Sequence, residues 1–278
     1  MVTKKYTMQH NYFTDKVVVV TGGSDGIGKA LVHQLLVLGA KVATCGRSHD
    51  KLYQLQISHP SFPLHTMVAD MGNETDCERF ITSCISTYGT IHILINNAGI
   101  SMRALFADTT VEVLRKVMEI NFFGVLHCTK FALAAITKNQ GHIVSIGSIA
   151  GYRGLPGRSA YSASKYALLG FMEAIRTELM PAGVHVLTVS PGFTASNIRN
   201  VALNSNGASQ GESPMNEGSM MTSDKVATII IKGITSKRRN IVLTFTGIRT
   251  MLINRWFPKL ADKLTYKYFF NKEGELVK

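Results

Sequence analysis

The chain has few cysteines and lacks metal-ligand spacings. Its four cysteines, Cys45, Cys77, Cys84 and Cys128, include no CxxC pair, and its nine histidines form no HExxH or comparable pattern. We therefore expect free thiols in a reducing compartment and no metal site.

Long apolar runs are also missing. No uninterrupted run approaches the roughly 18 residues that a membrane-spanning helix needs, and residues 1–16 lack the apolar core of a signal peptide. These absences predict a cytoplasmic protein. Charged residues make up only 17% of the 278 positions and apolar residues 45%, which excludes global disorder and allows one buried core.

Acidic residues are scarce relative to basic ones. The chain has 30 Lys and Arg against 18 Asp and Glu, a net charge of +12. Residues 237–278 alone hold ten basic residues and three acids, a net +7. Such asymmetry predicts that a basic terminal segment meets an anionic surface or ligand.

Strand-like and helix-like segments alternate along most of the chain. The run KVVVVT at 16–21 is β-branched throughout, as expected for a strand buried on both faces of a parallel sheet. Further strand-like runs lie at 41–45, 64–68, 91–96, 142–146, 184–190 and 240–244, and helix-like stretches at 27–38, 50–57, 74–88, 110–138, 161–180 and 223–234. This alternation predicts an α/β fold, a single Rossmann-like, doubly wound domain with a mostly seven-stranded parallel sheet.

We expect this domain to span 15–246, between an N-terminal extension at 1–14 and a basic amphipathic helical tail at 247–278. Within it, residues 194–221 break the alternation because they are rich in Ser, Asn and Gly and have no clear period. Long irregular segments in compact domains are usually functional lids or disordered. We expect a substrate lid that is mobile when empty and ordered over a bound substrate.

A glycine-rich turn, TGGSDGIG at 21–28, joins the first strand to the first helix. Glycines in such a turn let backbone amides approach a pyrophosphate, and the helix N-terminus adds partial positive charge. The GxxxGxG spacing differs from the usual GxGxxG fingerprint, so a tight turn that binds nothing is the alternative. The position between strand and helix favours a nucleotide site that includes Thr21, Gly22, Ser24, Asp25, Gly26, Ile27 and Gly28.

The end of the second strand discriminates between the two nicotinamide cofactors. A carboxylate there binds the ribose 2′-hydroxyl and repels a 2′-phosphate, whereas an arginine accommodates the phosphate. Here Gly46, Arg47 and Ser48 follow the strand without an acid. Arg47 can form a forked contact with a phosphate, although a solvated surface arginine is the alternative. Arg47, Ser48 and the missing carboxylate favour NADP(H) over NAD(H).

Ser148, Tyr161 and Lys165 form a pattern suited to proton transfer. Residues i and i+4 share one face of a helix, so Lys165 is expected beside the Tyr161 phenol. A phenol has an ordinary pKa of about 10, and a neighbouring cation lowers that pKa toward the working range of a general acid or base. Ser148 is placed to hydrogen-bond the same oxygen or a substrate carbonyl.

These motifs resemble those of the short-chain dehydrogenases/reductases over about residues 15–193. The resemblance rests on TGGSDGIG at 21–28, NNAG at 96–99, Asn121, Ser148, YSASK at 161–165 and Pro191-Gly192. It implies a catalytic tetrad of Asn121, Ser148, Tyr161 and Lys165. In the family the tyrosine exchanges a proton with the substrate oxygen and the serine positions that oxygen. The lysine lowers the tyrosine pKa and holds the nicotinamide ribose, and the asparagine keeps a water in the proton relay.

The resemblance also implies further cofactor contacts. Asp70, and Met71 after it, would lie near the adenine. The backbone of Asn97, Ala98 and Gly99 would lie near the ribose. The predicted cofactor contacts also include Pro191, Gly192 and Phe193. Thr194 or Ser196 would replace a family threonine that contacts the carboxamide. Asp25 departs from the family pattern, since many NADP-preferring members have a basic residue in the glycine turn. The cofactor preference therefore rests on Arg47.

The sequence thus predicts an NADP(H)-dependent oxidoreductase that transfers hydride between the nicotinamide and a carbonyl or secondary alcohol. The alternative is a catalytically inactive NADP-binding sensor or scaffold of the same fold, which would have no chemical reason to keep all four tetrad residues. A sugar-nucleotide epimerase is disfavoured because little chain follows Gly192. The resemblance implies a homodimer or homotetramer, and we expect no nucleic-acid partner.

The substrate is less well defined by the sequence. Candidates for the pocket wall are Ile149, Tyr152, Leu155, Phe193 and the lid. An apolar wall suits a lipid-like or steroid-like ketone, although the same residues could be ordinary packing. Arg153 and Arg158 either steer an acidic substrate or are solvated.

The C-terminal tail has an amphipathic pattern. Apolar residues at 257, 260, 264 and 268 fall at helical spacing beside lysines at 259, 263 and 267. A basic amphipathic helix with aromatic residues can lie in a membrane interface. The alternative is that its apolar face packs on the domain or on a second subunit. The protein would accordingly be free in the cytoplasm or peripheral to a membrane.

Overall fold

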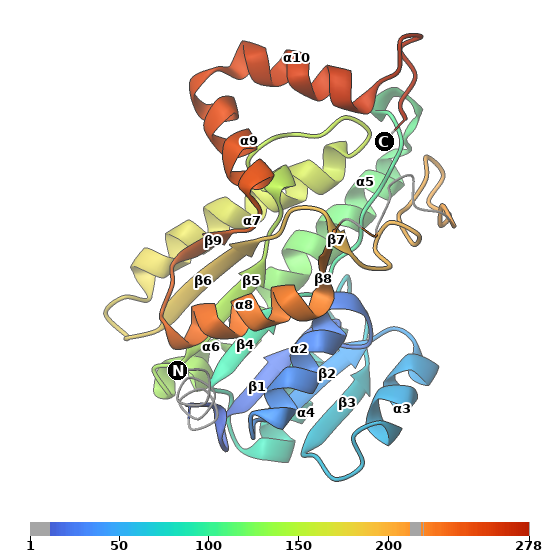
Figure 1. The fold of residues 1–278 in the computed structure, drawn as a ribbon. Helices are drawn as coiled ribbons and strands as arrows, with labels where there is room; N and C mark the ends of the chain where they lie inside the picture. Colours follow the sequence, from blue (N-terminus) through green and yellow to red (C-terminus); the bar gives the residue numbers. More distant parts are fainter. Residues whose placement is uncertain (1–11, 212–217, 219, 278) are drawn as a thin grey trace.

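The computed structural model describes residues 12–211, 218 and 220–277, and it contains a seven-stranded parallel sheet (Figure 1). In spatial order the strands are β3 (Leu64–Val68), β2 (Lys41–Gly46), β1 (Val17–Val20), β4 (Ile93–Asn96), β5 (His142–Ile146), β6 (His185–Ser190) and β9 (Asn240–Val242). The predicted Rossmann-like fold is confirmed, and each of the seven expected strands is present. The chain reverses its direction of travel across the sheet between β1 and β4, where parallel sheets bind their ligands.

Helices cover both faces of the sheet because alternate side chains of each strand point to opposite faces. On one face, α2 (Gly26–Val37) and α8 (Ser223–Thr235) pack on Val18 and Val20. On the other, α4 (Glu74–Tyr88), α6 (Gly124–Lys138) and α7 (Ser159–Glu178) pack on Val19, Ile143 and Val186. Helix α3 (His49–Ile57) lies against β2 and β3. The result is a three-layer sandwich with a core on each side of the sheet.

The helix expected at 110–138 is interrupted. It consists of α5 (Val111–Met118), a π-helical turn (Glu119–Phe123) and α6. By length and composition this segment could cross a membrane, but α5 packs on α7 and α6 on α4, as is typical of a core helix. Single π turns frequently mark functional sites, and this one contains the buried Asn121.

The C-terminal tail forms two helices instead of the single predicted one. Helices α9 (Phe245–Trp256) and α10 (Pro258–Phe269) lie beyond the carboxyl ends of the strands (Figure 1). The break occurs because Phe257 is non-helical, with φ −135° and ψ 63°, and Pro258 can only begin a helix. Helix α9 rests on the short 3₁₀ turn Ile149–Gly151, since a Cβ on Gly247 would lie 2.6 Å from Ile149 Cδ1.

The predicted lid is fixed to the domain at several points. Strand β7 (Thr194–Ala195) pairs with β8 (Met221–Thr222), and the Leu203 N–H donates to the carbonyl of Ser101 at 2.9 Å. Residues 212–217 and 219 of this lid lie outside the described residues, as do 1–11 of the predicted extension and 278 of the tail.

Candidate active site

A cavity of about 1150 Å³ lies at the carboxyl ends of the central strands. It exceeds the roughly 300–1,000 Å³ of pockets for drug-sized ligands, so it can hold a dinucleotide and a second molecule together. All predicted site residues line this cavity except Thr21, Gly28 and Asn121, which lie behind its wall. Among the residues that the structure describes, no three His, Cys, Asp or Glu are grouped to hold a metal. The four cysteines are buried free thiols, as predicted.

The glycine turn is held by close backbone contacts. Gly22 and Gly26 have φ of 70° and 52°, which side chains rarely allow. The Thr21 hydroxyl accepts a hydrogen bond from the Asn97 N–H at 3.0 Å, which joins the turn to the segment after β4. A Cβ on Gly28 would lie 2.1 Å from the Gly22 carbonyl oxygen. Thr21 and Gly28 therefore shape the site from behind without lining the cavity.

Asp25 has a cationic partner that the sequence analysis missed. The Lys51 ammonium lies 2.5 Å from the Asp25 carboxylate, which also accepts from the Gly26 N–H at 2.8 Å. Burial raises the pKa of Asp25, but the hydrogen bonds from Lys51 and Gly26 outweigh this effect and lower the pKa below its usual value. Lys51 lines the cavity together with Arg47 and Ser48. The available signal was a lysine four residues after Arg47, in the first turn of α3.

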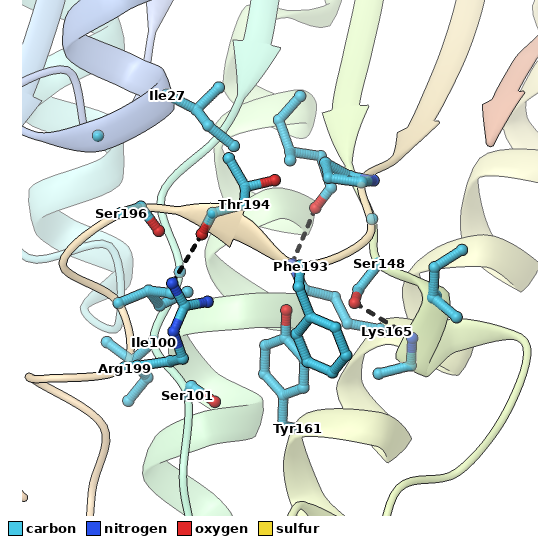
Figure 2. Close-up of a pocket in the computed structure, with 18 of the residues that line it drawn as sticks. Ile27, Ile100, Ser101, Ser148, Tyr161, Lys165, Phe193, Thr194, Ser196 and Arg199 are labelled. Atoms are coloured by element: carbon cyan, nitrogen blue, oxygen red, sulfur yellow. Dashed lines mark hydrogen bonds between the residues drawn. The ribbon is translucent and has the colours of Figure 1, made fainter. Parts of the chain in front are cut away.

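Ser148, Tyr161 and Lys165 come together beyond the end of β5 (Figure 2). The Lys165 ammonium lies 5.8 Å from the centroid of the Tyr161 ring and donates a hydrogen bond to the Ile146 carbonyl at 2.8 Å. The Ser148 hydroxyl accepts from the Ala150 N–H at 3.1 Å, which fixes its position. The i, i+4 spacing on α7 thus brings lysine and tyrosine together as the sequence predicted.

The predicted lowering of the Tyr161 pKa by Lys165 is wrong. Burial raises the pKa of Tyr161 above its usual value, although a hydrogen bond with Ser148 and the charges of Arg158 and Arg199 act in the opposite direction. Burial also lowers the pKa of Lys165 to about 8. Sequence spacing reveals a neighbouring cation but cannot reveal how deeply both groups are buried.

Asn121 connects three segments around the site. Its side-chain oxygen accepts from the Ile100 N–H at 2.8 Å, and its amide donates to the Ile100 carbonyl at 2.9 Å and the Ser164 hydroxyl at 3.1 Å. A Cβ on Gly99 would lie 3.1 Å from the same oxygen. Asn121 therefore holds the segment after β4 against α7 through the π turn. Its part in a water relay stays a prediction.

The substrate side of the cavity includes the tail. Ile149, Leu155 and Phe193 line it as expected, but Tyr152 does not; its carbonyl accepts from the Asn254 side chain at 2.8 Å. The apolar wall also contains Ile198, Val201, Ile253, Leu264, Tyr268 and Phe269. The Phe193 and Tyr268 rings stack with centroids 6.4 Å apart. The tail is thus a wall of the site, which its sequence alone did not indicate.

The two arginines near the tetrad differ from each other. Arg153 pairs with Asp262 of α10 at 2.7 Å and donates to Asn254 at 3.0 Å and Thr265 at 3.2 Å, so it clamps the tail onto the domain. Arg158 is only 7% exposed and lines the cavity. Neither arginine is a solvated surface residue.

Ser196 and Thr194 lie where the lid segment begins. A Cβ on Gly26 would meet the Ser196 Cβ at 3.4 Å, so the lid approaches the glycine turn here. The Thr194 hydroxyl donates to the Gly192 carbonyl at 3.3 Å, and Arg199 donates to the Thr194 carbonyl at 2.9 Å (Figure 2). Both candidate carboxamide contacts line the cavity.

The sequence of this chain is similar to those of known dehydrogenases. A sequence profile of the short chain dehydrogenases matches residues 16–207. Dehydrogenase/reductase SDR family member 7B of Mus musculus is 36% identical over 91% of this chain and 82% of its own length. Dehydrogenase/reductase SDR family protein 7-like of Drosophila melanogaster is 34% identical over 84% of this chain and 74% of its own length.

Solved structures share the fold. A short-chain dehydrogenase/reductase from Burkholderia phymatum in complex with NAD superposes with a TM-score of 0.78 at 21% identity, over 89% of this chain and 95% of that one. An alcohol dehydrogenase from Thermococcus sibiricus complexed with 5-hydroxy-NADP gives 0.72 at 21% identity, over 82% and 95%. At this identity the similarity establishes the architecture alone.

Proposed function

This chain belongs to the short-chain dehydrogenase/reductase family of oxidoreductases, and we propose that it interconverts a ketone and a secondary alcohol with a nicotinamide cofactor. The observation that supports this reaction is the meeting of Ser148, Tyr161 and Lys165 in the cavity that also contains the glycine turn. A sensor without chemistry would gain nothing from a buried lysine beside a buried phenol, because both are costly to desolvate.

The residues at the glycine turn fit a dinucleotide. A Cβ on Gly22 would lie 2.9 Å from Ala98 Cα, so only glycine lets this backbone close around the site. The α2 N-terminus supplies partial positive charge for a pyrophosphate. In this proposal Asp70 contacts the adenosine part, the backbone of 97–99 the ribose, and Thr194 or Ser196 the carboxamide; all of these residues line the cavity. When bound, the nicotinamide supplies or accepts the hydride.

The protein's own residues control the proton. In the direction of reduction, the Tyr161 hydroxyl donates its proton to the substrate oxygen and the Ser148 hydroxyl hydrogen-bonds that oxygen. The Tyr161 hydroxyl is protonated at neutral pH, as a donor must be, because burial raises its pKa above an ordinary value that is already about 10. The Lys165 ammonium lies 5.8 Å from the Tyr161 ring centroid, and its pKa of about 8 allows it to return a proton to the phenolate near neutral pH. Asn121 holds the surrounding segments in register.

NADP(H) is the preferred cofactor in this proposal. Arg47, Ser48 and Lys51 line the cavity beyond β2, and no acid follows that strand. Asp25 does not oppose a 2′-phosphate strongly, because Lys51 and the α2 N-terminus already compensate its charge. Lys51 can reach from this pair toward an incoming phosphate.

The central test is Tyr161→Phe, with Tyr166→Phe as the matched control on the same helix. Loss of a general acid lowers rates by about 10²–10⁴-fold, so we expect kcat to fall by that factor on any carbonyl that the wild type reduces. Cofactor affinity should stay within about twofold. Tyr166 is 45% exposed and should be silent. If turnover survives Tyr161→Phe, Tyr161 is not the proton donor. If the wild type binds the cofactor but reduces no member of a broad carbonyl panel, the sensor alternative is favoured.

The substrate class and the cellular location follow from the tail. The apolar wall favours a lipid-like or steroid-like ketone. On the outside of α9 and α10, Phe245, Trp256 and Phe257 are 80%, 68% and 63% exposed. Basic residues at 255, 259, 263 and 267 lie on the same two helices, whereas Arg249 of α9 lines the cavity. Packing on the domain accounts for Ala261 and Phe269, which are buried, but not for these exposed rings. We assign this face to an anionic membrane surface and the protein to the cytoplasm and its membranes.

Vesicle sedimentation tests the membrane contact. Wild type should bind vesicles of mixed phosphatidylcholine and phosphatidylglycerol more tightly than pure phosphatidylcholine. Trp256→Ser combined with Phe257→Ser should weaken this binding at least tenfold, since two large rings leave the interface. Tyr53→Ser removes an aromatic ring that is 54% exposed on α3 and should have no effect. If the double variant instead abolishes the homodimer or homotetramer that the family resemblance implies, the face is a subunit contact and the membrane assignment fails.

A further inference from the structure

A buried, unpaired guanidinium lies beside the proposed proton donor. Arg158 is 7% exposed and precedes Tyr161 by three residues, which places both on one side of the first turn of α7. Both residues line the cavity. Among the described residues, no carboxylate lies within ion-pair distance of Arg158, and its Nε has no hydrogen-bond partner. Burying a charge without a partner is unfavourable unless a ligand supplies one.

The surroundings of Arg158 are also positive. Burial lowers the pKa of Arg158, and Arg199 and Arg103 lower it further, whereas Tyr161 and Tyr268 raise it. Arg199 lines the same cavity. The α7 N-terminus adds partial positive charge at this point, because Arg158 is its N-cap residue and forms no side-chain cap.

Unsatisfied polar atoms concentrate here. The described residues contain six buried side-chain nitrogen or oxygen atoms without a hydrogen-bond partner, and three of them belong to Arg103, Arg158 and Ser159. The segments are adjacent, since the Ala104 N–H donates to the Gly157 carbonyl at 3.0 Å. By contrast, the nearby Arg153 has three side-chain partners in the tail. One arginine therefore completes the fold, and the other is left for a ligand.

Building on the proposed function, we propose that the substrate carries an oxyanion, a phosphate or a carboxylate, next to its reacting carbonyl, and that Arg158 and Arg199 bind this group. A guanidinium offers paired N–H donors that match both anions. The apolar wall from the tail then receives the rest of the molecule. The substrate class is an anionic, amphiphilic ketone, and the anion fixes the carbonyl against the Tyr161 hydroxyl.

Paired substrates test this assignment. The wild type is assayed with 3-oxo-octanoate and its methyl ester, and with hydroxyacetone phosphate and hydroxyacetone. We expect kcat/KM to favour the anionic member of at least one pair by tenfold or more, and the better pair distinguishes carboxylate from phosphate. Arg158→Gln should reduce this anionic-to-neutral ratio at least tenfold, and Arg158→Lys should reduce it less. Arg153→Gln also removes one cavity cation; because it loosens the tail, it should raise KM for both members of each pair and leave their ratio unchanged.

A binding measurement separates this inference from the proposed reaction. Calorimetric titration of the wild type with inorganic phosphate should detect a site that Arg158→Gln removes and Arg47→Gln retains. If the wild type turns over no carbonyl but binds phosphate in an Arg158-dependent way, the anion site is supported and the proposed ketone–alcohol interconversion is contradicted. Two outcomes would overturn the role of Arg158 in anion binding. One is that the wild type turns over the anionic and neutral members of each pair equally, a result that does not depend on whether the Arg158 variants fold. The other is that phosphate binding is lost only in Arg47→Gln.

Discussion

The cavity has a side at the glycine turn, where we propose that the cofactor binds, and a side at the tail, where we propose that the substrate binds. This cofactor side and this substrate side are built in different ways. On the cofactor side, residues 21–28 and 96–99 pack backbone against backbone, and Gly22 and Gly28 leave no space for a side chain. On the substrate side, α9 and α10 are held by side chains. Arg153 contacts three tail residues, and the Phe193 ring stacks on Tyr268.

This difference in construction predicts how each side responds to amino-acid substitution. Close backbone packing tolerates no added atoms, because the displaced neighbour is itself backbone. Contacts between partly exposed side chains contribute little free energy each, with ion pairs at about 0–1 kcal/mol. We therefore expect the tail to open more readily than the sheet and the glycine turn, with the burial of Ala261 and Phe269 as the main cost of opening. A substrate wall that opens and a cofactor site that does not would suit a large apolar ketone.

The largest expected effect is that of Gly28→Ala. Its Cβ would lie 2.1 Å from the Gly22 carbonyl oxygen, and such overpacking costs about 1–3 kcal/mol of unfolding free energy. If the turn shifts instead, cofactor affinity should fall by about 10- to 100-fold. Gly170→Ala is the matched control, since Gly170 lies in α7 with no atom within 4 Å of an added Cβ. It should stabilise the protein by about 0.5–1 kcal/mol in denaturant unfolding. Equal effects of the two variants would contradict the picture of a closed cofactor side.

A smaller effect is expected at the 2′-phosphate. Hydrogen bonds to charged groups contribute about 1.5–3 kcal/mol, so Arg47→Gln and Lys51→Gln should each lower the NADPH-over-NADH ratio of kcat/KM by about tenfold or more. Lys29→Gln removes an exposed cation from α2, outside the cavity, and should leave the ratio unchanged. A ratio near one in the wild type would refute the NADP preference.

The cofactor side could be predicted from the sequence because its chemistry is local in the chain. The glycine turn, Arg47 and the Tyr161–Lys165 spacing each occupy a few consecutive residues, and the strand pattern fixes where they meet. The seven strands followed from β-branched runs for the same reason. Lys51 was missed although it is near, because its pairing with Asp25 depends on how α3 is placed against the turn.

On the substrate side, Ile149, Leu155 and Phe193 were predicted, but the contribution of the tail could not be, because its contacts with the domain are distant in sequence. Arg153 and Asp262 are 109 positions apart, and nothing in either neighbourhood indicates the other. The π turn at Asn121 and the break at Phe257 arise from packing and from backbone geometry that a helical pattern does not reveal. The raised pKa of Tyr161 likewise depends on burial, which spacing cannot give.

The smallest expected effect separates the two sides most directly. Asp262→Asn removes the charge that Arg153 contacts, and the Asp262 side chain is 69% exposed, so the unfolding free energy should change by less than about 1 kcal/mol. The tail should nevertheless open more often, so hydrogen exchange of α10 amides should accelerate and the substrate KM should rise about two- to fivefold. Cofactor affinity and exchange in β1 should stay unchanged. Asp50→Asn, on the exposed face of α3, controls for the loss of one surface charge. The tail contacts the domain through the turn after β5, through Phe193 and through Arg103, and among the described residues no hydrogen bond or ion pair joins it to the glycine turn. A parallel loss of cofactor affinity in Asp262→Asn would therefore show that the two sides are coupled.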